Sequence, residues 1–169
     1  PDERIDLDEG LVAWRWGSDD PDMPVVLLVH GFEGHRGQFG AMIDALLERG
    51  YAAVALDVPA HGESAGDELT AVKFIAALER VLDHLKSVHA VIGHSMGAAM
   101  ALHTLATRLG GKRGDVPRAA LISAPSALGR ELRRFAKAVG LSDRGTRAFI
   151  RSVEEHVGRP ADDFDVRHI

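Results

Sequence analysis

The chain alternates short apolar runs with segments of helical periodicity, and this alternation limits the folds open to it. Residues 24–29 (PVVLLV) form an unbroken apolar run, which is typical of a strand buried on both faces of a parallel sheet. Runs at residues 51–56, 88–92 and 119–123 predict three further core strands, and residues 11–16 predict a short edge strand. Strand and helix repeated with short connections predict an α/β fold: a mostly parallel, doubly wound sheet with helices on both faces.

Helical periodicity predicts the segments between the strands. Apolar residues recur at helical spacing within residues 39–47 and 69–86, and residues 95–109 are apolar nearly all round, which is typical of a buried helix. Two amphipathic helices are predicted within residues 127–158, with their arginines on a solvated face. Residues 110–115 (GGKRGD) resemble a linker between two patterned segments.

Composition and charge exclude several classes of function. The 169 residues contain no cysteine, which excludes disulfides, thiolate nucleophiles and Cys-ligated zinc. A net charge of -5 argues against a nucleic-acid partner. No apolar run approaches the roughly 20 residues that cross a bilayer, and no N-terminal signal pattern is present, so we expect no membrane insertion and a cytoplasmic location. The histidine spacing lacks the patterns of metallohydrolases, and we expect neither a metal nor a cofactor.

Residues 93–97 (GHSMG) form a G-x-S-x-G motif between a predicted strand and a predicted helix. In this context the motif is typical of a nucleophile elbow, a tight turn that lifts the serine hydroxyl above the sheet. Side chains at Gly93 and Gly97 would collide with neighbouring backbone. The turn also places the Met96 amide and the positive end of the helix dipole beside any oxyanion. Ser95 is therefore the candidate nucleophile, and a purely structural Gly-Ser turn is the plainer alternative.

His30-Gly31-Phe32 follows the first core strand. Gly31 lets the backbone turn, and the Phe32 amide can then point at the same oxyanion as the Met96 amide, which would supply the paired donors that acyl transfer needs. A glycine-rich turn without a catalytic role is the alternative for this segment taken alone.

The motifs at residues 26–32 (VLLVHGF), 56–64 (LDVPAHGES) and 93–97, in that order and spacing, resemble the α/β-hydrolase superfamily, close to its small serine esterases and monoacylglycerol-lipase-like members. The resemblance implies a hydrolase core over residues 1–126. It further implies that residues 127–169 begin a helical cap and lead into a further strand.

The resemblance also implies site residues: Ser95 as nucleophile, with the backbone amides of Phe32 and Met96 as the oxyanion hole. The substrate would be a small-molecule carboxylic ester. The family places its acid and then its histidine on later strands, whereas the chain beyond Ser95 is taken up mainly by the two predicted cap helices. We therefore expect the acid and the base to lie outside this chain, which alone would be weakly active or inactive.

The histidines and Asp57 offer other candidates, each with a plainer interpretation. His156 and His168 follow Ser95 in the required order, but one lies on a predicted cap helix and the other near the last residue. Asp57 precedes the nucleophile and is interpreted as a buttress of the loops. The remaining candidates are interpreted as structural: His30 and His94 as core groups, His61 as a loop residue, and His84, His89 and His103 as surface residues.

Two other classes of function stay open. Gly31, Gly34 and Gly37 follow a strand, with Asp57 at the end of the next one, which is the outline of a dinucleotide-binding site. The spacing departs from G-x-G-x-x-G, because Glu33 occupies the second glycine position. A non-catalytic fragment or binding module on the hydrolase fold is the second alternative. If the last predicted strand is an unpaired edge, we expect a homo-oligomer or a complementing C-terminal segment to cover it.

Overall fold

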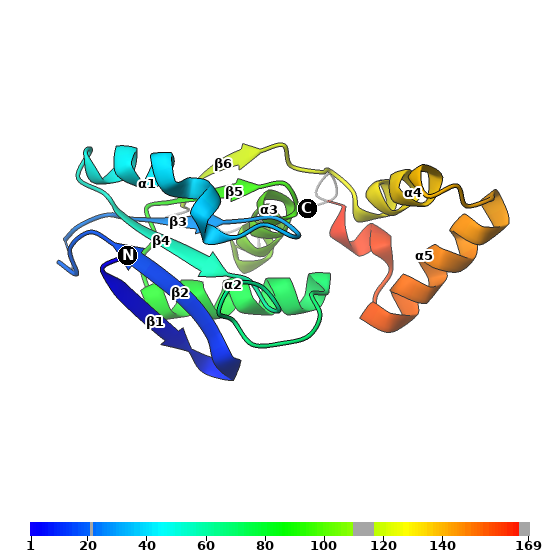
Figure 1. Ribbon diagram of the computed structural model, residues 1–169, viewed down its shortest axis with the longest axis horizontal. Coiled ribbons are helices and arrows are strands. Elements are labelled where there is room, and N and C mark those ends of the chain that lie inside the picture. The colour runs from blue at the N-terminus through cyan, green and yellow to red at the C-terminus, as the bar shows by residue number, and fades with distance from the viewer. Residues whose placement is uncertain (21, 110–116, 166–169) are drawn as a thin grey trace. The chain divides into compact units, whose positions relative to one another are not determined.

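The computed structural model describes residues 1–20, 22–109 and 117–165 (Figure 1). The chain divides into two compact units, residues 1–124 and 125–169. The predicted linker at residues 110–115 lies outside the described residues.

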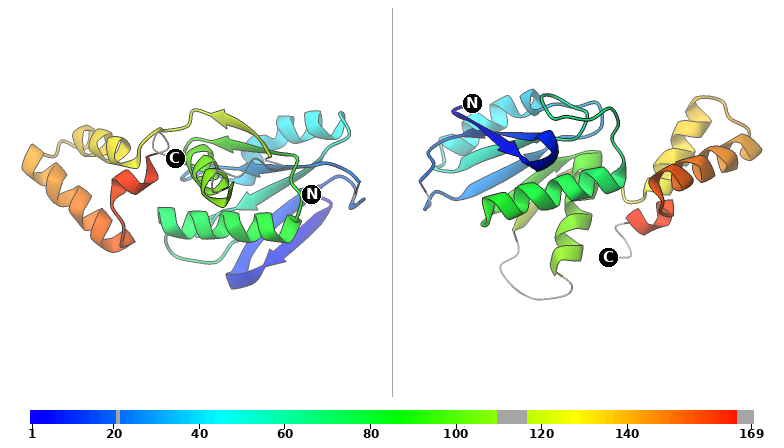
Figure 2. Two further views of the ribbon diagram at one scale, coloured as in Figure 1. Left: turned by 180° about the vertical axis from the view of Figure 1, so that it is seen from behind. Right: turned by 90° about the horizontal axis from the view of Figure 1, so that it is seen from below.

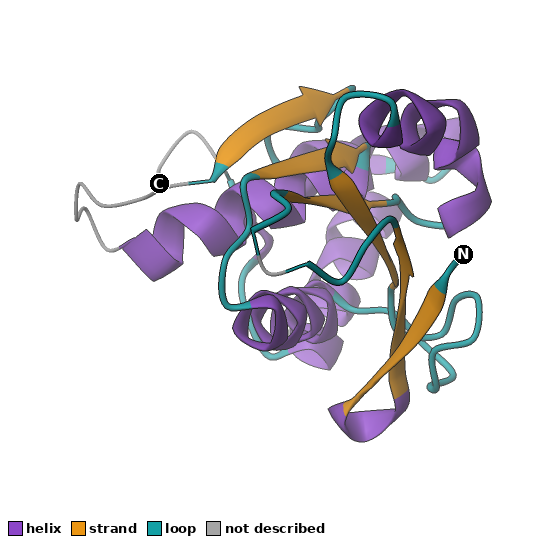
Figure 3. Cartoon of the chain, turned by 90° about the vertical axis from the view of Figure 1, so that its left-hand side faces the viewer, coloured by secondary structure: helices purple, strands orange, loops and turns teal. Residues whose placement is uncertain are grey.

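The first unit is built on one six-stranded sheet in the order β1-β2-β4-β3-β5-β6 (Figure 3). The strands are β1 (Glu3–Leu7), β2 (Leu11–Trp16), β3 (Val25–Val29), β4 (Ala52–Asp57), β5 (Ala90–His94) and β6 (Arg118–Ile122). The last four run parallel to one another, and the β1–β2 hairpin is added antiparallel to β4. This arrangement confirms the predicted α/β class and its mostly parallel sheet.

Helices cover both faces of this sheet, as the sequence predicted (Figure 2). On one face lies α1 (Gly40–Leu47). Val26 and Leu28 of β3 pack there against Ile43 of α1 and against Phe39, the residue before this helix. The alternate residue Leu27 points to the opposite face and is also fully buried. That face carries α2 (Ala71–Leu85) and α3 (Met96–Leu109), which pack against each other, and α3 also contacts β5.

The sheet register aligns the strand ends from which the site is built. Val29 of β3 lies opposite Leu56 of β4 on one side and Gly93 of β5 on the other. The loops that follow these three strands therefore leave the sheet at one edge, where open parallel sheets place their sites.

Three expectations about the sheet and its helices were wrong. Residues 11–16 are not an edge strand, because β1 pairs outside them. The short β1 was missed because it buries only one side chain fully and lacks a core-strand pattern. The strand predicted as core at residues 119–123 is exposed at every position of β6, because no further strand pairs with it within the described part of the chain. His103 is buried rather than on the surface, since α3 is covered by both β5 and α2.

The second unit contains α4 (Leu128–Ala138), α5 (Asp143–Val157) and the short 3-10 helix η3 (Ala161–Phe164). The rings of Phe135 and Phe149 join α4 to α5, with centroids 5.8 Å apart. Ser142 caps the start of α5, and Gly158 ends it in the left-handed conformation. The arginines of α4 and α5 are exposed, as predicted, but Phe135 is 56% exposed. In the described residues, no helix has the length and hydrophobicity of a transmembrane segment.

Candidate active site

Ser95 occupies a strained turn between β5 and α3. Its φ is +53°, a left-handed conformation that is rare for residues other than glycine and is often retained at functional sites. The Ser95 amide donates to the Ile122 carbonyl of β6 at 2.8 Å, and the Ser95 carbonyl accepts from the Ala98 amide at 3.0 Å. The backbone at Ser95 is thus tied to both the sheet and the helix.

The two glycines of the motif are required by close packing. A Cβ at Gly93 would lie 2.5 Å from the Ala98 Cα, and one at Gly97 would lie 2.3 Å from the His30 carbonyl oxygen. Both distances are shorter than real Cβ contacts, so the collisions expected from the sequence are present in the structure.

The turn after β3 lies directly against this elbow. A Cβ at Gly31 would be 2.9 Å from the Ser95 Cβ and 3.5 Å from the Met96 nitrogen. The first helical turn of α3 therefore faces the segment that carries Phe32. Within the described part of the chain, neither the Phe32 amide nor the Met96 amide has a hydrogen-bond acceptor. Two free donors flanking a serine are suited to bind an oxyanion.

His30 is fully buried and orients the Gly31–Phe32 peptide. The Val58 amide donates to its Nε2 at 3.3 Å, so Nδ1 carries the proton and donates to the Gly31 carbonyl at 2.8 Å. Burial lowers the pKa of His30 below its ordinary value. The ring is therefore kept neutral with both nitrogens occupied, and its interpretation as a core group is confirmed.

His61 has the same hydrogen-bonding pattern on the loop after β4. Its Nε2 accepts from the Glu33 amide at 3.0 Å, so its Nδ1 donates to the Pro59 carbonyl at 2.9 Å. With both ring nitrogens occupied, neither His30 nor His61 has a free lone pair to take a proton from Ser95.

Asp57, at the end of β4, anchors the surrounding loops. Its fully buried carboxylate accepts from Trp14 Nε1 at 3.2 Å and from the Glu63 amide at 3.1 Å, and it pairs with the Arg36 guanidinium. The guanidinium of Arg36 also stacks over the Trp14 ring, 4.5 Å from its centroid. Gly62, at φ +56°, is the residue that this site requires, because a Cβ there would lie 2.3 Å from the Asp57 Cγ.

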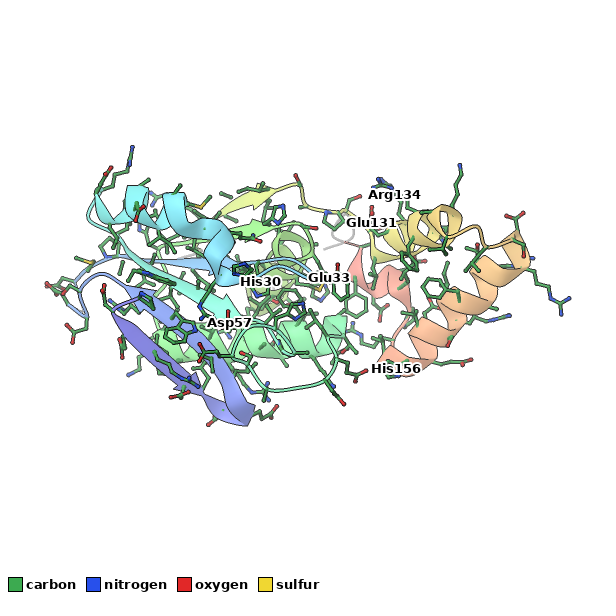
Figure 4. All side chains as sticks on the ribbon, viewed as in Figure 1. His30, Glu33, Asp57, Glu131, Arg134 and His156 are labelled. Carbon is green, nitrogen blue, oxygen red and sulfur yellow. The ribbon has the colours of Figure 1, made fainter. Side chains whose placement is uncertain are left out.

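The structure thus brings together the segments that carry Ser95, Met96 and Phe32, and it surrounds them with loops held by buried polar groups. His30, Glu33 and Asp57 can be followed at the carboxyl ends of β3 and β4 in Figure 4. Sequence reasoning missed the partners of Asp57 and the contact of His61 with Glu33. No short motif signals these contacts, since they join residues far apart in the chain. Among the described residues, no side chain makes a hydrogen bond to the Ser95 hydroxyl.

The family follows from comparison with known proteins. The sequence model of the alpha/beta hydrolase fold family matches residues 24–154. This chain belongs to the alpha/beta hydrolase family. The dinucleotide-binding alternative is therefore set aside, and in this hydrolase-fold chain the glycines after β3 belong to the turn beside the elbow.

Human monoglyceride lipase is 27% identical to this hydrolase-fold chain over an alignment of 114 residues, and the match covers 63% of the chain and 38% of the lipase. A putative hydrolase from Agrobacterium vitis superposes with a TM-score of 0.64 at 20% identity, covering 98% of this chain and 70% of that one. The monoacylglycerol lipase of Paleococcus ferrophilus gives a TM-score of 0.59 at 20% identity, covering 94% and 69%. The chain thus spans well under half the length of its human relative, and the two structural similarities show the fold.

Proposed function

We propose that the protein is a carboxylic ester hydrolase of the serine type. The observation that carries the proposal is Ser95 itself, held at a left-handed φ between β5 and α3. The Met96 amide follows it directly, and the turn that carries the Phe32 amide packs against it at Gly31. The similarity to human monoglyceride lipase supports an ester as the substrate.

In the proposed reaction, the Ser95 Oγ attacks the ester carbonyl carbon and gives up its proton to a general base. The negative charge on the carbonyl oxygen is bound by the Phe32 and Met96 amides, with help from the positive end of the α3 dipole. The carbon–oxygen bond to the alcohol then breaks, and the alcohol leaves with the proton that the base held. Water attacks the acyl-Ser95 ester in the same way and releases the acid.

The base and its acid are proposed to lie outside the described part of the first unit. His30 and His61 have both ring nitrogens engaged, and Asp57 is committed to Arg36, Trp14 and the Glu63 amide. A serine helped only by an oxyanion hole keeps residual activity, so the 169-residue chain by itself should turn over esters about 10⁴-fold more slowly than an intact relative.

A fluorophosphonate probe tests the proposal, because it forms a covalent bond with an activated serine. In protein that also carries the proposed base and acid, we expect a single adduct by intact mass, mapped to Ser95 by peptide sequencing and lost in Ser95→Ala. The 169-residue chain by itself should label weakly or not at all. In parallel, p-nitrophenyl acetate hydrolysis by the protein with base and acid should fall by about 10⁴-fold or more in the same variant. Labelling spread over several serines, or equal in Ser95→Ala, would contradict the assignment of the nucleophile.

A non-catalytic binding module on the hydrolase fold is the second candidate. It is favoured by the engaged nitrogens of His30 and His61. The fluorophosphonate probe distinguishes the two candidates. In protein that also carries the proposed base and acid, a hydrolase is labelled at Ser95, whereas a binding module leaves Ser95 unlabelled.

A further inference from the structure

We propose that His61 is a positioning residue for the oxyanion hole, because it accepts the Glu33 amide and so stabilises the turn that orients the Phe32 amide. This inference rests on the proposed function. It concerns the contact between the loop after β4 and the turn after β3, which brings His61 to Glu33 across 28 positions of sequence.

The Gly31–Phe32 peptide is a rigid plane, so fixing its carbonyl fixes its amide. The Gly31 carbonyl accepts from His30 Nδ1 at 2.8 Å and from the Gly34 amide at 3.0 Å. In a trans peptide the Phe32 N–H points the opposite way from that carbonyl. The direction of the proposed oxyanion donor therefore depends on the turn that brings the Gly34 amide back to Gly31.

That turn contains a strained residue. Glu33 has a φ of +56°, which costs an L residue roughly 1–2 kcal/mol relative to ordinary conformations. The His61 Nε2 accepts from the Glu33 amide at 3.0 Å and so stabilises the strained conformation. The ring of His61 also meets the Phe32 ring edge-on, with centroids 6.0 Å apart, and it lies 5.4 Å from the ring of His30.

His61 is itself held on a rigid loop. Its Nδ1 donates to the Pro59 carbonyl, its amide donates to Val58 at 3.0 Å, and its carbonyl accepts from Ser64 at 3.1 Å. The Ala60 amide closes the same loop on Ala65 at 3.1 Å. Losing the ring leaves Glu33 free to leave its left-handed conformation, and the Gly34 contact that orients the Phe32 peptide is then lost.

The test compares three variants of the intact protein: His61→Ala, His61→Gln and His35→Ala. His35 is the matched control, because its Nδ1 also accepts a backbone amide, that of Gly37 at 2.9 Å. Within the described part of the chain, its side chain has no hydrogen bond or ring contact with Phe32 or Glu33. Glutamine can place its Oε1 near the position of Nε2 and accept from Glu33.

We expect His61→Ala to lower kcat about 10- to 100-fold with KM changed less than about threefold, since misdirecting one oxyanion donor weakens transition-state binding only. His61→Gln should recover most of the loss, and His35→Ala should stay within about twofold of the parent protein. If kcat is unchanged in His61→Ala while the parent protein labels at Ser95, the positioning role is wrong. If the parent protein does not label at Ser95, the proposed function is wrong.

A second measurement does not depend on activity or on the folding of a variant. The imidazole nitrogen shifts of His61, read by long-range nitrogen–proton correlation in the unmodified protein, should report a neutral ring with the proton on Nδ1. The opposite tautomer would place a proton on Nε2, where the Glu33 amide could not donate, and would overturn the proposal.

Discussion

Replacing Gly97 by alanine tests the packing that brings the serine to the end of the sheet. The new Cβ would lie 2.3 Å from the His30 carbonyl oxygen and 2.5 Å from the Val29 carbonyl oxygen. Val29 is paired with β4 on one side and β5 on the other, so its backbone has little freedom to retreat. The helix must therefore move away from the sheet by more than half an ångström.

Two effects of opposite sign decide the free energy of unfolding. Gly97 lies in the first turn of α3, where helix propensity favours alanine over glycine by at most about 1 kcal/mol. Overpacking against fixed backbone costs about 1–3 kcal/mol, and a contact this short belongs at the upper end. The net expectation is a loss of about 2 kcal/mol, which lowers the melting temperature by about 4–8 °C in a chain of this size. Gly40→Ala is the matched control, because a Cβ at this first position of α1 meets nothing within 4 Å.

Urea unfolding followed by tryptophan fluorescence measures both variants. Trp14 and Trp16 are the two tryptophans of the chain and both lie on β2, so the signal reports the first unit. We expect Gly97→Ala to unfold at lower urea than the parent chain and Gly40→Ala to unfold at equal or slightly higher urea. A Gly97→Ala variant as stable as Gly40→Ala would refute the steric reasoning.

Three further predictions concern pH, the buried carboxylate and the exposed strand. Because burial lowers the folded-state pKa of His30 below the unfolded value of about 6.5, its contribution to stability should be complete above that pH. The contribution should decline as the pH falls toward the folded pKa, by at most about 1.4 kcal/mol per pH unit. In His30→Gln, the urea midpoint should therefore depend less on pH between about pH 7.5 and pH 5 than it does in the parent chain. Arg36 pairs with two carboxylates, the fully buried Asp57 and the more exposed Glu63. Asp57→Asn removes the buried one and should cost about 1.5–3 kcal/mol by the same assay. Asp83→Asn, which breaks an exposed pair with Arg108 in the same unit, is the control and should change the urea midpoint little. Equal losses in Asp57→Asn and Asp83→Asn would contradict the stabilising role of the buried carboxylate. The Arg118 amide and the Ile122 carbonyl make hydrogen bonds on the β5 side, so the amides of Ala119 and Leu121 face the free edge of β6. We propose that a second copy or a complementing segment pairs with this edge. The 169-residue chain should self-associate in sedimentation, with both amides protected from exchange; a monomer in which both exchange freely would refute this pairing.

Several features of this protein follow from local sequence alone. The run at residues 24–29 has no polar position, and such a run is stable only between two covered faces, so a buried parallel strand could be predicted there. The G-x-S-x-G motif between strand and helix is similarly informative, because only glycine tolerates the short contacts at Gly93 and Gly97. Each of these constraints acts on residues that are close in sequence and is therefore visible in the residue pattern.

The tertiary structure decided what depends on residues brought together from distant segments. The exposure of β6 could not be predicted from its apolar sequence, because the burial of a strand depends on whether another strand pairs beside it. The role of His61 likewise depends on a backbone amide in a different loop, and the ion pair of Asp57 with Arg36 joins the end of one strand to the turn after another. Backbone amides carry no residue-specific signal, and side-chain partners across loops have no fixed spacing. For this reason the sequence identified the candidate nucleophile, whereas only the folded chain revealed which groups hold the loops around it.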